Sequence, residues 1–97
     1  MYTRLKVELD YEEIAFLKRY GLKLKAPVKS NDIVALLPKK VNGCSLKTSR
    51  LPNGEWGAYY EGEMEYDSMN IEEFRVEALY ELLIWCYRFG HLKANKI

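Results

Sequence analysis

Five carboxylates stand at odd-numbered positions between residues 55 and 67, interleaved with aromatic and small residues: Glu55, Glu61, Glu63, Glu65 and Asp67. Clustered carboxylates can ligate metal ions or act as acid–base pairs. In an extended strand, however, alternate residues point the same way at intervals of about 6.5–7 Å. Carboxylates at that interval do not converge on one cation, and an open strand face gives them no difference in environment that would separate their pKa values. The row is therefore expected to be the outward face of a strand, with an acidic docking surface as its functional alternative.

The remaining chemically capable residues are few. His91 is the single histidine, so the chain lacks the parts for a Ser-His-Asp triad or for a zinc site built on several histidines. Cys44 and Cys86 are far apart in the sequence, and we expect both to be reduced core residues. We therefore expect that the protein is not an enzyme and that it binds no metal and no cofactor.

Charge is unevenly distributed along the chain. Residues 18–50 contain nine Lys or Arg and only one acidic residue, whereas residues 55–81 contain nine Asp or Glu and only one Arg. A basic cluster of this kind is typical of nucleic-acid-binding surfaces. The residues that would form it are Lys23, Lys25, Lys39 and Lys40. The alternative is a solvated surface that neutralises the acidic strand within the same fold.

The first elements are predicted from alternation and capping signals. Residues 3–9 alternate apolar and polar side chains, which predicts a half-buried strand. Asp10 followed by Glu13 matches a capping box for a helix over residues 11–20 that ends at Gly21. Its expected buried residues are Tyr11, Ile14, Ala15 and Leu17.

Residues 22–38 are the most ambiguous stretch. Alternation over residues 22–25 predicts a short edge strand ended by Pro27. The apolar run 32–38 fits either a buried strand or a single helical turn, and its β-branched residues favour the strand.

A β-hairpin is predicted around residues 44–62, in one of two registers. A two-residue turn at Asn53-Gly54 would pair Leu51 with Trp56, whereas a three-residue loop, Pro52-Asn53-Gly54, would pair Leu51 with Glu55. Only the second places the apolar residues of both strands on one face, so we expect the second.

A long amphipathic helix is predicted over residues 71–89. Asn70 and Glu73 match its N-cap pattern, and Gly90 ends it, with Leu92 packing back as in a Schellman motif. Residues 93–97 are expected to form a loose basic tail. The 97 residues should fold as a single domain of the α+β class, with an antiparallel sheet of three to four strands and two helices packed on one face. The expected core consists of Leu5, Val7, Leu9, Ile14, Leu17, Leu46, Trp56, Tyr60, Phe74, Leu79, Leu82 and Trp85.

Three segments, LPKKVNG at 37–43, WGAYYEGE at 56–63 and EALYELLIWCYRFGHLKANK at 77–96, resemble small uncharacterised proteins of bacterial phages and integrated elements. In those proteins an LPK…NG segment precedes a hairpin and a closing EAL…LLIW helix. The resemblance covers roughly residues 37–96 and implies a cytoplasmic accessory protein with an α+β fold. It implies no catalytic or binding residue.

The function we expect is that of a small non-enzymatic protein that binds a host or phage protein. Its binding residues would be Tyr59, Glu61, Glu63 and Glu65, on the open face of the sheet. Two alternatives remain: nucleic-acid binding through the basic segment 18–50, and self-assembly into a homo-oligomer through an open sheet edge. With no export signal and no apolar run of about 20 residues, we expect a cytoplasmic protein with no membrane partner.

Overall fold

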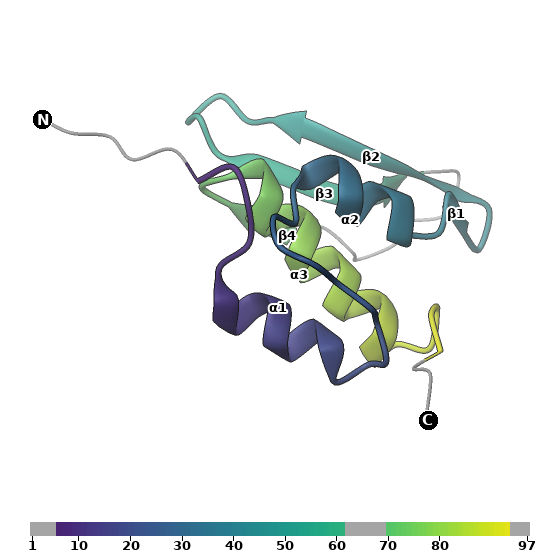
Figure 1. The fold of residues 1–97 in the computed structure, drawn as a ribbon. Coiled ribbons are helices and arrows are strands. Elements are labelled where there is room, and N and C mark those ends of the chain that lie inside the picture. Colours follow the sequence, from purple (N-terminus) through teal and green to yellow (C-terminus); the bar gives the residue numbers. More distant parts are fainter. Residues whose placement is uncertain (1–5, 62–69, 94–97) are drawn as a thin grey trace, which may run out of the picture.

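A computed structural model describes residues 6–61 and 70–93, Asn70 by its backbone only, and shows three helices and a four-stranded antiparallel sheet (Figure 1). The elements in chain order are α1 (Tyr11–Lys18), α2 (Ser30–Leu36), β1 (Lys40–Val41), β2 (Cys44–Arg50), β3 (Trp56–Glu61), β4 (Asn70–Glu72) and α3 (Arg75–Arg88). The strands are ordered β1-β2-β3-β4, and neighbours in the sheet are also neighbours in the chain. The predicted α+β class is confirmed, with one helix more than expected.

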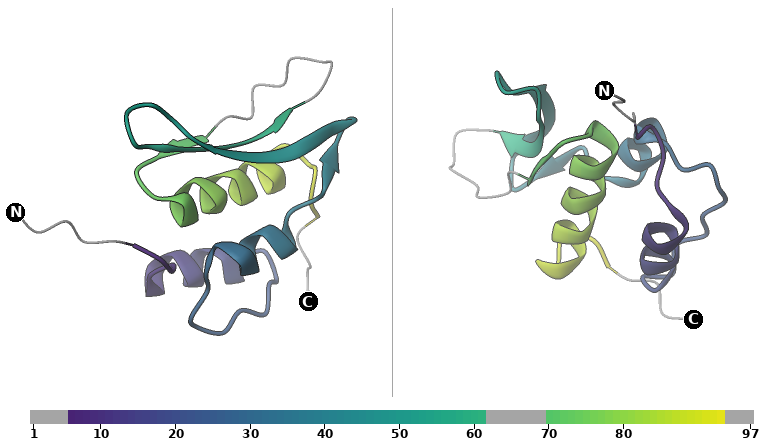
Figure 2. Two further views of the ribbon diagram at one scale, coloured as in Figure 1. Left: turned by 90° about the horizontal axis from the view of Figure 1, so that it is seen from above. Right: turned by 90° about the vertical axis from the view of Figure 1, so that its left-hand side faces the viewer.

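The layers follow from the contacts of α3. This helix packs on β3 and β4, and α2 packs on α3. Both views in Figure 2 show α3 between the sheet and the other two helices. Direct packing of two helices on the sheet stays a prediction.

Helix α1 begins as its sequence predicts. The Asp10 carboxylate accepts a hydrogen bond from the Glu13 backbone N–H, and the Glu13 carboxylate accepts one from the Asp10 N–H, both at 2.9 Å. Ile14 and Leu17 are buried, as expected. Burial of Tyr11 and Ala15 was a wrong prediction: these two residues, four apart, share a different face of the helix, and Tyr11 is 86% exposed.

The predicted first strand is reduced to a single bridge in residues 6–9. Glu8 pairs with Lys29, and the Leu9 N–H donates to the Val28 carbonyl at 2.9 Å. Leu9 and Val28 are buried, but Val7 is 61% exposed, so its assignment to the core was wrong. Without a neighbouring strand and a covering layer, alternation alone does not bury a side chain. Leu5 lies outside the described residues, and residues 22–25 form no strand.

The run at residues 32–38 is largely helical, so the strand interpretation was wrong. Helix α2 places Ile33 and Leu37, four residues apart, towards the core, where both are buried. The Asp32 carboxylate accepts a hydrogen bond from the Lys29 N–H at 2.8 Å, which satisfies a donor at the start of the helix.

The hairpin adopts the register with the three-residue loop. The Leu51 N–H donates to the Glu55 carbonyl at 2.7 Å, and Arg50 lies opposite Trp56. Gly54 has φ +90°, a left-handed conformation that this loop requires. The inward residues include Cys44, Ala58 and Tyr60, all buried.

Helix α3 begins at Arg75 rather than at Ile71. Residues 70–72 instead form β4, pairing with residues 56–58 of β3. At the other end, the His91 N–H donates to the Cys86 carbonyl at 2.8 Å and the Gly90 N–H to the Tyr87 carbonyl at 3.4 Å, which confirms the predicted Schellman ending. Residues 94–97 of the expected tail lie outside the described residues.

One core connects the three helices with β1, β2 and β3. Of its predicted members, Leu9, Ile14, Leu17, Tyr60, Leu79 and Leu82 are buried, and Leu46, Trp56, Phe74 and Trp85 are partly buried against them. Also buried, outside the predicted core, are Val28, Ile33, Leu37, Val41, Val76, Leu83 and Ile84.

Candidate functional site

The face of the sheet opposite α3 is formed by side chains from β2, β3 and β4. The register places Lys47 opposite Tyr59 and Ile71 opposite Gly57, and Glu61 follows Tyr59 on the same side. Lys47 and Glu61 are exposed, and Ile71 is 47% exposed. We call the surface formed by Lys47, Tyr59, Glu61 and Ile71 the open sheet face.

Two of the four predicted protein-binding residues can be placed on this face. Tyr59 is half-buried, and its hydroxyl donates a long hydrogen bond of 3.4 Å to the Ser49 Oγ. Glu61 is exposed at the end of β3. Glu63 and Glu65 lie outside the described residues. Ile71 was missed because the sequence analysis assigned it to the helix, and its β-branched side chain beside Asn70 was the only strand signal.

The predicted basic residues divide between two places. Lys23 and Lys25 line a shallow hollow of about 410 Å³, together with Lys18, Leu22 and Leu24. Lys39 and Lys40 are not part of its lining and lie beside and within β1, beyond α2. The hollow therefore combines three ammonium groups with two apolar side chains and has no carboxylate in its lining.

Aromatic rings join the turn that follows α1 to the C-terminal end of α3. The rings of Tyr20 and Tyr87 stack with centroids 4.3 Å apart, and Phe16 meets Tyr20 edge-on at 5.8 Å. Tyr20 lies between Lys18 and Leu22 in the chain, but neither ring of the stacked pair belongs to the lining of the hollow.

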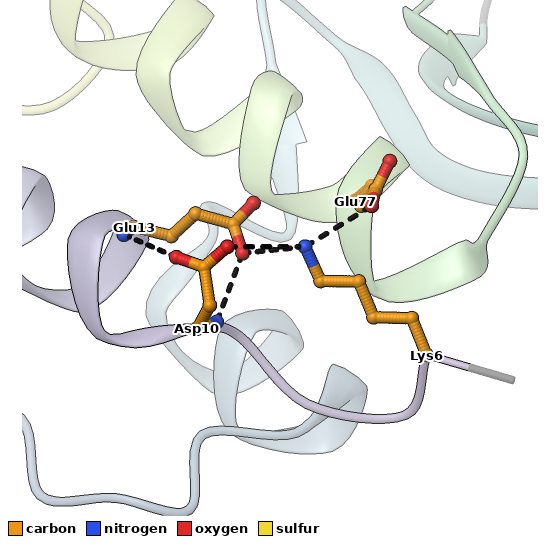
Figure 3. Close-up of polar contacts among 4 residues, drawn as sticks. All are labelled: Lys6, Asp10, Glu13 and Glu77. Atoms are coloured by element: carbon orange, nitrogen blue, oxygen red, sulfur yellow. Dashed lines mark hydrogen bonds and ion pairs between the residues drawn. The ribbon is translucent and has the colours of Figure 1, made fainter. Parts of the chain in front are cut away.

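The other ends of the two helices are joined by an ion cluster centred on Lys6 (Figure 3). The Lys6 Nζ lies 2.6 Å from the Glu13 Oε1, 3.0 Å from the Glu77 Oε1 and 3.8 Å from the Asp10 Oδ2. Burial alone would lower the pKa of Lys6, but the hydrogen bonds to Glu13 and Glu77 outweigh it, so the pKa is raised. These ion pairs fix the position of α1 relative to α3, so we interpret the cluster as structural and not as a ligand site.

The aromatic cluster and the ion cluster hold α1 and α3 side by side in the same direction. Acidic and basic residues lie at opposite ends of this helix pair. Acidic residues gather at the starts of both helices. The pKa of Glu72 is raised there, first by burial and then by repulsion from the carboxylates of Glu81, Glu77, Glu55 and Glu13. The hollow's lysines lie near the C-terminal end of α1. Within the described ranges every ion pair involves Lys6, and none joins the basic segment to an acidic residue.

The Cys86 thiol and the His91 imidazole make contacts that are typical of structural residues. The Cys86 Sγ donates to the Tyr60 hydroxyl at 3.8 Å, and that hydroxyl donates to the Pro38 carbonyl at 2.7 Å. Burial raises the pKa of the Cys86 thiol to about 11, and the contact with Tyr60 opposes part of that rise. The His91 ring stacks on Trp85 at 4.8 Å. In residues 6–61 and 70–93, no group of three or more His, Cys, Asp or Glu side chains could hold a metal ion.

The helices described here are too short or too polar to cross a membrane. A scan against protein-family models, a search of curated proteins and a search of solved structures each give no match to this chain. Any assignment of function therefore rests on the surfaces themselves.

Proposed function

We propose that this chain is a small non-enzymatic protein that binds another protein through the open sheet face. The observation that carries the proposal is the 47% exposure of Ile71 on the same face as Tyr59, with Lys47 and Glu61 beside them. Protein interfaces typically combine apolar and aromatic side chains with a polar rim. The cytoplasmic, phage-type setting is part of the same proposal and rests on the sequence resemblance alone.

Affinity capture from a lysate of the cell that encodes the chain tests this function. Wild-type protein and the double variant Tyr59→Ala/Glu61→Lys would be compared, each with and without nuclease, and bound proteins identified by mass spectrometry. We expect one specific protein to survive nuclease and to be captured at least about tenfold less by the variant, because truncating an interface tyrosine can cost 2 kcal/mol or more.

The matched control is Glu12→Lys, which reverses an exposed carboxylate on α1, away from the sheet. It should capture as much partner as the wild type. Equal capture by the double variant, with circular dichroism showing an intact fold, would remove the open sheet face as the binding site.

Nucleic-acid binding is the second candidate, because the hollow places Lys18, Lys23 and Lys25 together and the aromatic residue Tyr20 lies two residues from Lys18 in the chain. Basic grooves with aromatic rings are the usual surface for single strands. Self-assembly would use a free sheet edge, and β2 has one, but the cationic side chains of that edge oppose pairing with a second copy.

For this second function, we predict that Lys23→Glu/Lys25→Glu weakens binding of a single-stranded oligonucleotide and flattens its salt dependence. Each lost phosphate contact should reduce the slope of log K against log salt by about 0.7. The control Lys39→Glu/Lys40→Glu carries the same charge change outside the hollow and should retain more of the binding. Binding that does not depend on salt, or no binding by the wild type, would eliminate the candidate.

A further inference from the structure

One edge of β2 has no neighbouring strand over half its length. Strand β1 pairs only with the start of β2, through Val41 with Cys44 and Lys40 with Ser45. One further hydrogen bond runs from the Leu46 N–H to the Lys39 carbonyl at 3.1 Å. From residue 47 to residue 50, β2 has β3 on one side and no described strand on the other.

The hydrogen bonds at the two ends of β2 determine which backbone groups face this free edge. The Leu51 N–H bonds towards β3 and the Leu46 N–H towards β1. Bonding directions alternate along an antiparallel strand, so residues 47 and 49 bond to β3. The N–H and C=O groups of Thr48 and Arg50 therefore point outwards, and no other backbone group in the described chain pairs with them.

The side chains around this edge are cationic. Lys47 and Arg50 belong to the free half of β2, and Lys39 and Lys40 stand at β1 beside it. Strand β2 carries no carboxylate. Positive side chains at an edge oppose pairing with a second copy of the same edge, whereas they attract a strand of opposite charge.

We propose that the free edge of β2 binds an extended acidic segment of a partner protein, which adds a fifth strand to the sheet. Main-chain bonds to Thr48 and Arg50 supply the pairing. Lys47 and Arg50 lie on opposite faces of the sheet, so carboxylates on either face of the added strand meet a cation, which supplies the preference for an acidic sequence. The edge shares the Lys47 side chain with the open sheet face, but its pairing groups, the backbone N–H and C=O of Thr48 and Arg50, are not part of that face, so either proposal can fail without the other.

Amide hydrogen exchange measured by NMR on the full chain tests the pairing directly. The probes are two capped peptides of equal length, one alternating Glu with Val and the other alternating Lys with Val. The acidic peptide should slow exchange at the Thr48 and Arg50 amides at least about tenfold, while the amides of residues 47 and 49 are protected before it is added. Absence of this protection, or equal protection by the lysine peptide, overturns the proposal.

Two variants, each with a matched control, test where the peptide binds. Thr48→Pro removes an outward N–H that does not bond to β3 and should weaken binding of the acidic peptide at least about tenfold, whereas Thr48→Val keeps the N–H and should bind as the wild type does.

Lys47→Glu leaves every backbone group in place and should also weaken binding of the acidic peptide. Its control is Lys29→Glu, which replaces an exposed lysine outside the sheet and should not weaken binding. If Lys47→Glu and Lys29→Glu bind equally, the charge complementarity is wrong. If Thr48 and Arg50 become protected with rising protein concentration and no peptide, a second copy is the occupant and the proposal is overturned.

Discussion

Replacement of Leu82 by alanine should lower the free energy of unfolding by about 2–5 kcal/mol. Leu82 is fully buried in α3, the helix that packs on both the sheet and α2, so the deletion leaves a cavity in the shared core. Since a domain of this size is stable by about 5–15 kcal/mol, the loss is a large fraction of the total. Urea denaturation followed by circular dichroism measures it.

The matched control is Val7→Ala. Strict alternation in the sequence assigns Val7 to the core, but its side chain is 61% exposed. We expect its replacement to change the free energy of unfolding by less than about 0.5 kcal/mol. A cost at Val7 as large as that at Leu82 would contradict the observed course of the N-terminal segment.

The second large effect is a loss of stability in alkali. Burial raises the pKa of the Cys86 thiol from 9.0 to about 11. Below pH 9 the thiol is protonated in both the folded and the unfolded chain. Between about pH 9 and 11 the unfolded chain loses this proton and the folded chain retains it, so the free energy of unfolding falls as the pH rises. Because one pKa unit corresponds to about 1.4 kcal/mol, the total decline from this group is on the order of 3 kcal/mol.

Urea titrations at pH 8, 9, 10 and 11 measure this decline in the wild type and in Cys86→Ala. Burial also raises the pKa of Tyr80 to about 12, which adds a decline of the same sign above pH 10. The variant should therefore lose the slope between pH 9 and 10 and keep part of the slope above it. The same slope in both proteins from pH 9 to 10 would show that Cys86 is not the responsible group.

The sequence predicted the structure best where local contacts allow only one arrangement of the backbone. The hairpin register follows from the positions of Leu51, Glu55 and Gly54, because the competing register exchanges the buried and exposed faces. Asp10 and Glu13 likewise define the start of α1 without help from the rest of the fold.

The failures occurred where tertiary contacts override local preference. Asn70 and Glu73 match a helix start, yet residues 70–72 complete the sheet beside β3, and α3 begins at Arg75. The β-branched residues of α2 favour a strand, but a helix brings Ile33 and Leu37 to one side, against α3.

The candidate sites were predictable only in part. Alternation along β3 places Tyr59 and Glu61 opposite the core face, as expected from sequence. The hollow could not be derived, since it depends on how residues 22–25 turn back beside Lys18 after α1. The free edge of β2 depends on the shortness of β1, which no residue pattern near Lys40 indicates.

Site-specific photocrosslinking is a direct test of protein binding through the open sheet face. A photoreactive amino acid would replace Tyr59 in one sample and Glu12 in another, and both full-length proteins would be irradiated in nuclease-treated lysate. We predict a discrete protein adduct from position 59 and none from position 12. No adduct from position 59, or the same adducts from both positions, would contradict this prediction.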